Sequence, residues 1–121
     1  MSDPFFDTNI LIDWLWDRPP AINELSRYKR HRISRIVWTE IIAGEPLEQR
    51  DTIRQLLSPF DVVEVDARIA NSAADIRYRT RMKLMDAYIL ATAQVNGAIL
   101  ITRNTKEFPA EMPGIRVPYQ L

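Results

Sequence analysis

A strand pattern passes directly into a helix pattern within Pro4-Phe-Phe-Asp-Thr-Asn-Ile-Leu-Ile-Asp-Trp-Leu-Trp16. This stretch begins with a short apolar run typical of a buried strand, and this run ends in the polar triplet Asp7-Thr8-Asn9. From residue 10 to residue 16 the apolar side chains return at helical spacing. We therefore predict a buried strand that turns directly into a helix, with Asp7 at the turn.

Strand and helix patterns alternate along the rest of the chain. We predict further strands at residues 32–37, 61–65, 98–102 and 115–117, and helices at residues 21–28, 38–43, 49–57, 67–78 and 86–95. The strand at 98–102 is continuously apolar, as in parallel sheets buried on both faces, and the strand before Pro118 is expected at an edge. The sum is an α/β fold in which a central parallel sheet of about five strands is flanked by helices on both faces.

Length and composition exclude several classes of protein. The chain has 121 residues, of which 46% are hydrophobic, so we expect one core and one domain over residues 1–121. Its apolar runs are far shorter than the roughly 20 residues of a membrane span, and the acidic start Met1-Ser-Asp-Pro4 is unlike a secretion signal. The absence of cysteine excludes disulfides and thiolate metal sites. The expected location is the cytoplasm, without a membrane partner.

Oxygen-bearing side chains follow the predicted strands, at the ends where parallel sheets collect ligands. Asp7 follows the first strand, Glu40 and Asp86 fall in the first turns of two helices, and Asn104 and Glu107 follow the strand at 98–102. Each of the acids alone is compatible with helix capping or with the helix dipole. Gathered together, carboxylates repel unless a cation compensates, and an oxygen-rich set favours Mg²⁺ or Mn²⁺ over zinc. Such a site can activate water against a phosphodiester bond, as nucleases do.

The chain resembles the PIN-domain ribonucleases, and most closely the VapC-type toxins of bacterial toxin–antitoxin pairs. The resemblance runs nearly end to end, in four segments: Asp7-Thr-Asn-Ile-Leu-Ile-Asp13, Ser34-Arg-Ile-Val-Trp-Thr-Glu-Ile-Ile-Ala-Gly44, Lys83-Leu-Met-Asp-Ala-Tyr-Ile-Leu-Ala-Thr-Ala93 and Leu100-Ile-Thr-Arg-Asn-Thr-Lys-Glu-Phe108. It implies a compact PIN-like α/β fold and an Mg²⁺- or Mn²⁺-dependent endoribonuclease. The family's acidic metal positions fall on Asp7, Glu40 and Asp86.

The family's fourth catalytic position falls on an amide in this chain. Asn104 stands there and Glu107 follows a turn later, so either residue can fill the position, and the number of metal ions stays open. Thr8 and Thr102 lie beside these positions and are candidates for orienting ligands or water, with caps and turn bonding as the alternative.

Contacts to a nucleic acid must be local, because the formal net charge of the chain is zero. Basic residues flank the acidic positions in sequence, and we expect them to hold the phosphates of RNA: Arg81, Lys83, Arg103 and Lys106. A solvated charged face is the alternative for such a group.

The resemblance also implies partners. They are a VapB-type antitoxin protein whose tail covers the active site, an RNA substrate for which tRNA is one candidate class, and a second copy of the chain in a homodimer. Large apolar residues near the first helix fit an interface, with a packed core as the alternative: Leu11, Ile12, Trp14, Leu15, Trp16 and Trp38.

Two other functions fit parts of the pattern. A receiver-like phosphoryl-transfer domain also places aspartates at strand ends, but the chain has no fitting lysine at a later strand end. A catalytically silent PIN-like module that binds RNA or protein is the other alternative, because Asn104 stands at the fourth acidic position.

Overall fold

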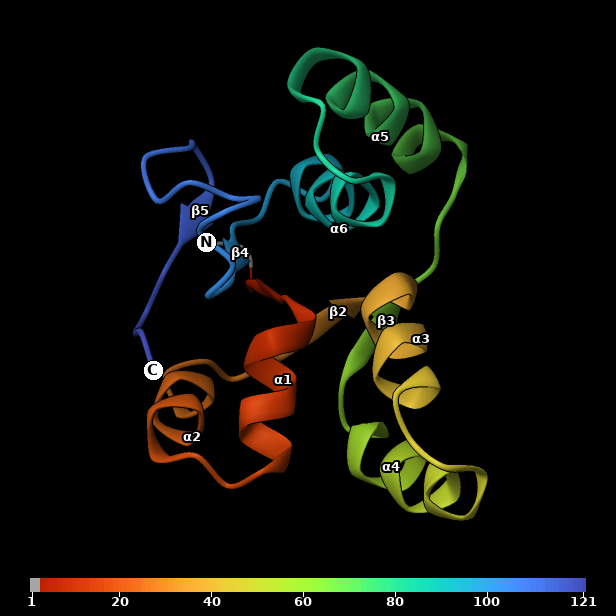
Figure 1. The fold of residues 1–121 in the computed structure, drawn as a ribbon, viewed down its shortest axis with the longest axis vertical. Helices are drawn as coiled ribbons and strands as arrows, with labels where there is room; N and C mark the ends of the chain where they lie inside the picture. Colours follow the sequence, from red (N-terminus) through yellow and green to blue (C-terminus); the bar gives the residue numbers. More distant parts are fainter. Residues whose placement is uncertain (1–2) are drawn as a thin grey trace.

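The computed structural model describes residues 3–121, and in this part of the chain five strands form one sheet (Figure 1). Met1 and Ser2, which belong to the acidic start discussed above, lie outside the described residues. The strands are β1 (Phe5–Phe6), β2 (Arg32–Ser34), β3 (Asp61–Val63), β4 (Leu100–Ile101) and β5 (Ile115–Arg116). Their spatial order is β3-β2-β1-β4-β5 and every neighbouring pair is parallel, which confirms the predicted parallel sheet and the edge position of β5.

Helices flank this sheet, as predicted. They are α1 (Thr8–Leu15), α2 (Pro19–Ser26), α3 (Arg35–Ala43), α4 (Arg50–Leu57), α5 (Ala67–Thr80) and α6 (Leu84–Val95), with a short 3₁₀ helix, η1 (Leu47–Gln49). Helix α5 packs along α6 on one side of the strands, and α1 and α2 lie on the other (Figure 1). Among residues 3–121, no helix has the length and apolar character to cross a membrane.

The start of α3 corrects the predicted boundary. Residues Ile36 and Val37 were expected in a strand, but β2 ends at Ser34, whose hydroxyl accepts a hydrogen bond from the Ile36 N–H at 3.0 Å and caps α3. The helix therefore begins at Arg35, and Glu40 lies in its second turn rather than in its first. Apolar β-branched residues are found on buried helix faces as well as in strands. The boundary predicted from composition alone was therefore wrong.

The start of α2 differs for a related reason. The pair Pro19-Pro20 was expected to precede the helix, which was predicted to start at residue 21, but both prolines lie in its first turn. Proline is tolerated there because the first N–H groups of a helix have no partner inside it.

The centre of the core is formed by β1 and β4. Phe5, Phe6, Leu100 and Ile101 are at most 1% exposed. Helix α6, which is apolar nearly all round, also buries six of its residues. Strands buried this deeply hold their carboxyl ends at fixed positions, and the candidate site lies at these ends.

The apolar residues of α1 divide between core and surface. Leu11 is fully buried, and the half-buried Trp14 packs edge-on against Phe60 with ring centroids 5.3 Å apart. Ile12 and Trp16 are instead 41% and 73% exposed. A packed core therefore accounts for part of the predicted apolar set, and the remainder forms a surface.

Candidate active site

Asp7 lies where β1 passes into α1, and its carboxylate is held from two segments of the chain. The side chain is 3% exposed. Its Oδ1 accepts the Thr8 N–H at 2.7 Å, and its Oδ2 accepts the Thr102 hydroxyl at 2.7 Å and the Asn9 amide at 3.2 Å. Burial raises the pKa of Asp7, the hydrogen bonds oppose this effect, and the charge of Glu40 raises the pKa further. Asp7 therefore caps α1, the role that was the alternative to metal binding, and it does so as a buried acid.

Glu40 reaches the same place from α3. The hydroxyl of Thr8 donates a hydrogen bond to Glu40 Oε1 at 2.6 Å, and the Thr8 N–H binds Asp7. Thr8 therefore links the two acids. Glu40 is exposed, whereas Asp7 is buried and Asp86 is half-buried.

Asp86 stands in the first turn of α6, as predicted, and is half-buried. Its pKa is raised to about 6, first by burial and then by the charges of Asp7, Glu107 and Glu40, while Lys83 lowers it. Carboxylates from β1, α3, α6 and the loop after β4 are therefore close enough for their charges to act on one another. The acids that the sequence pattern singled out share one electrostatic environment.

Asn104 and Glu107, the two candidates for the fourth position, have different contacts. The Asn104 side-chain oxygen accepts the Glu107 backbone N–H at 3.2 Å, and the Asn104 backbone N–H donates to the Thr102 hydroxyl at 2.9 Å. Asn104 therefore caps the turn that carries Glu107. The charge that reaches Asp86 from this loop is that of the Glu107 carboxylate.

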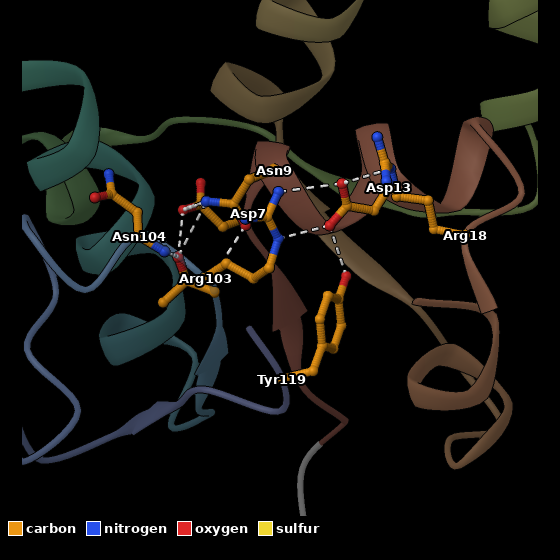
Figure 2. A network of polar contacts seen from close by, with 8 residues as sticks. Asp7, Asn9, Asp13, Arg18, Arg103, Asn104 and Tyr119 are labelled. Carbon is orange, nitrogen blue, oxygen red and sulfur yellow. Dashed lines mark hydrogen bonds and ion pairs between the residues drawn. The ribbon is translucent and has the colours of Figure 1, made fainter. Parts of the chain in front are cut away.

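The basic residues predicted to contact RNA fall into two groups. Arg81, Lys83 and Lys106 are exposed, and Arg81 and Lys106 line a hollow of about 220 Å³ together with Glu107. Arg103 is half-buried, and its guanidinium donates hydrogen bonds to the carboxylate of Asp13 (Figure 2). Three of the four predicted residues thus present their charge to solvent near the acids.

Asp13 is a buried acid that the sequence analysis did not single out. It lies on α1, is 3% exposed, and contacts Arg103, Tyr119 and Arg18 (Figure 2). The available signal was one acid among the apolar residues 10–16, since charged side chains are rarely buried without a partner.

The carboxylate oxygens available at the site are suitable ligands for a hard divalent cation. Within residues 3–121, no group of three aspartate, glutamate or histidine side chains is already drawn together tightly enough to hold an ion. The available ligands are nevertheless carboxylates from several segments, and the pKa of Asp86 is raised by burial and then by repulsion from the other carboxylates. A divalent cation among them would offset this repulsion, and carboxylate oxygens are the ligands that Mg²⁺ and Mn²⁺ prefer.

The strand order argues against one of the alternative functions. In receiver-type domains the first strand lies next to an edge strand, whereas β1 is the central strand here. The sheet therefore has a different topology from the receiver-like alternative.

Comparison with known proteins places the chain in a family. A model of the PIN domain matches residues 5–110. The tRNA(fMet)-specific endonuclease VapC of Shigella flexneri is 28% identical over 114 residues, an alignment that covers 84% of this chain and 86% of the relative. A toxin–antitoxin complex from Klebsiella pneumoniae contains a chain that is 40% identical, with a TM-score of 0.91 over 98% of this chain and 100% of that chain.

A further solved structure has the same fold. In the DNA-bound VapBC of Salmonella typhimurium, one chain is 27% identical with a TM-score of 0.79, and 96% of each chain is covered. These matches confirm the resemblance based on the four sequence segments. Because the family model matches most of its length, the chain belongs to the PIN domain family and is a homologue of VapC.

Proposed function

We propose that this protein is the toxin of a toxin–antitoxin pair, acting as a metal-dependent endoribonuclease that hydrolyses phosphodiester bonds. The observation that carries the proposal is that Thr8 donates hydrogen bonds to both Asp7 and Glu40, at 2.7 Å and 2.6 Å. Burial and then the charges of the neighbouring acids raise the pKa of Asp86, in keeping with this arrangement. Membership of the PIN domain family and the similarity to a toxin–antitoxin complex support the proposal. Residues 1–121 form the proposed single domain, and the cytoplasm is its proposed location.

Asp7, Glu40 and Asp86 are the proposed ligands of Mg²⁺ or Mn²⁺. Bound there, such a cation would polarise the scissile phosphate and lower the pKa of the attacking water. The chain itself keeps the carboxylates oriented, because the Thr8 hydroxyl holds Glu40 and the Thr102 hydroxyl holds Asp7. Preorganised ligands avoid the cost of ordering them when the cation and the substrate bind.

We assign the fourth acidic position to Glu107 and a supporting role to Asn104. The prediction is that Glu107→Gln lowers kcat/KM for RNA by about tenfold or more, whereas Asn104→Asp stays within about twofold. Glutamine removes the carboxylate, while aspartate at 104 can still accept the Glu107 N–H. Initial cleavage rates at fixed Mg²⁺ measure both effects. Wild-type rates for Glu107→Gln together with faster cleavage by Asn104→Asp would reverse the assignment.

RNA is held, in this proposal, by the exposed cations beside the acids. Arg81 and Lys106 line the hollow that also contains Glu107, and Lys83 precedes the first turn of α6. Contacts from such residues to phosphates position a substrate without reading its sequence. The Shigella relative is named as specific for tRNA(fMet), so tRNA is the first RNA class to test.

A VapB-type antitoxin is the proposed protein partner. Ile12, Trp16 and Glu40 line a hollow of about 190 Å³, so exposed apolar side chains lie directly beside a proposed metal ligand. An extended or helical peptide with apolar anchors fits such a surface and would cover Glu40. A homodimer, which the family resemblance implies, is the proposed form of the protein without antitoxin.

The proposed function is tested by incubating the purified, antitoxin-free protein with a small-RNA pool that includes tRNA. Discrete fragments are expected with Mg²⁺ or Mn²⁺, and EDTA should abolish them because the carboxylates then have no cation to bind. The readout is gel separation of end-labelled RNA. Cleavage that survives EDTA would contradict metal dependence. Binding of RNA or antitoxin without cleavage under any of these conditions would instead support the catalytically silent module.

A further inference from the structure

An ion pair between the buried Asp13 and the half-buried Arg103 lies next to the candidate site but contains none of the proposed metal ligands. The Asp13 carboxylate accepts hydrogen bonds from Arg103 Nε at 2.6 Å and Arg103 Nη2 at 3.1 Å, so the guanidinium binds it through two nitrogens (Figure 2). The hydroxyl of Tyr119, from the C-terminal segment, donates to the same carboxylate at 2.8 Å, and Arg18 Nε lies 3.7 Å away. Asp13 joins α1, the loop after β4 and the end of the chain.

Arg103 is tied to α1 a second time, through its backbone. Its N–H donates to Asn9 Oδ1 at 3.0 Å, and the Asn9 amide donates to Asp7 Oδ2 at 3.2 Å. The residue before it, Thr102, donates its hydroxyl to the same Asp7 oxygen at 2.7 Å. The loop is thus fastened to α1 by the backbone and by the side chain of one residue, and the Asp7 carboxylate lies at the end of this network (Figure 2).

We infer that Asp13 and Arg103 are positioning residues of the active site, and that they orient the Asp7 carboxylate by clamping the loop after β4 to α1. The inference rests on the proposed function, because it takes Asp7 to be a metal ligand. It gives Arg103 a different task from the phosphate contact predicted from sequence, since the guanidinium is occupied by Asp13. Tyr119 extends the clamp to the C-terminal segment.

The Asp13–Arg103 pair serves to orient the loop more than to stabilise the fold. Removing two charges from water costs about as much as their attraction returns, so buried ion pairs contribute little net stability but demand one geometry. Small displacements of reacting groups are costly in catalysis. A planar guanidinium bound through two nitrogens restricts the position of the loop more than a single contact does.

The protein contains a matched control pair. Glu24 on α2 is 5% exposed and accepts Arg116 Nε at 2.7 Å, Arg116 Nη2 at 3.0 Å and the Tyr28 hydroxyl at 3.0 Å. This pair repeats the chemistry of Asp13, Arg103 and Tyr119 but ties α2 to β5. The Arg116 carbonyl accepts the Thr102 N–H at 3.0 Å within the sheet, and a substitution at Glu24 leaves that backbone bond in place.

The test compares Asp13→Asn with Glu24→Gln. Both lose a buried charge opposite an arginine, and both should lower the melting temperature. We expect Asp13→Asn to lower kcat by about tenfold or more with KM for RNA within about twofold, and to weaken Mn²⁺ binding by about tenfold. Glu24→Gln should change neither kcat nor the Mn²⁺ dissociation constant by more than about twofold. Equal effects of the two variants on kcat and on Mn²⁺ binding would show that the pair acts only on stability.

Arg103→Lys keeps the positive charge, loses the second donor to Asp13, and supplies a second variant should Asp13→Asn not fold. A loss in kcat of about fivefold or more supports positioning. A higher KM with unchanged kcat would overturn it in favour of a phosphate contact. Calorimetric titration with Mn²⁺ separates this inference from the proposed function. If the wild type binds Mn²⁺ but cuts no RNA, the nuclease assignment fails. The Mn²⁺ affinities of the variants then still decide the role of the pair. A wild type that binds no Mn²⁺ would overturn both.

Discussion

Asp86→Asn is expected to lower kcat/KM for RNA cleavage by about a hundredfold or more, because the ligand that it removes supports several kcal/mol of transition-state stabilisation. Asparagine has the same shape, so packing at the start of α6 is retained. Burial, and then the charges of the neighbouring acids, disfavour the ionised form of Asp86, and the loss of its charge removes both penalties. The melting temperature at neutral pH without metal should therefore not fall. Initial rates and circular-dichroism melting measure the two effects.

A matched acid on the neighbouring helix serves as the control for this prediction. Asp75 is exposed on α5, and Asp75→Asn should leave the cleavage rate within about twofold of the wild type, as expected for a surface substitution. If Asp86→Asn produced the same fragments at the same rate as the wild type, one of two conclusions would follow. Either a contaminating nuclease makes the cuts, or Asp86 is not a catalytic residue.

Phe6→Ala is expected to lower the free energy of unfolding by about 3–5 kcal/mol, the usual cost of removing a fully buried phenylalanine. Phe6 lies in the central strand β1 and is 0% exposed. Its ring packs edge-on against Tyr28 and His31, with centroids 5.9 Å and 5.6 Å away. The deleted ring leaves a cavity that the rigid sheet fills only in part. Urea denaturation followed by circular dichroism measures the loss.

Trp16→Ala provides the comparison for Phe6→Ala. Trp16 is a larger aromatic residue but is 73% exposed, so its truncation should change the free energy of unfolding by no more than about 0.5 kcal/mol. If both variants lost the same stability, Trp16 would be buried in the dissolved protein, as it would be at the interface of a stable dimer. If Phe6→Ala lost less than about 1 kcal/mol, the central position of β1 would be in doubt.

Local patterns explain why much of the fold was predictable. An apolar run that ends in Asp7-Thr8-Asn9 specifies a strand, a cap and a helix start within a few residues, and the structure has all three at that place. The prediction failed where local signals compete. Ile36 and Val37 are compatible with a strand or a helix, and the cap that Ser34 provides places them in the helix α3. The prolines of α2 are a second case, since they can stop one helix or start the next.

The parallel α/β sheet, the acids at its strand ends and the family resemblance could be predicted, because each depends on residues that are neighbours in the chain. Which side chains meet depends instead on how the chain folds back on itself. Asp13 pairs with Arg103, 90 positions away, and the charge of Glu107 reaches Asp86 from another segment. No periodic pattern in the sequence indicates such contacts. They arise because β1 pairs with β4, which brings the start of α1 against the loop after β4.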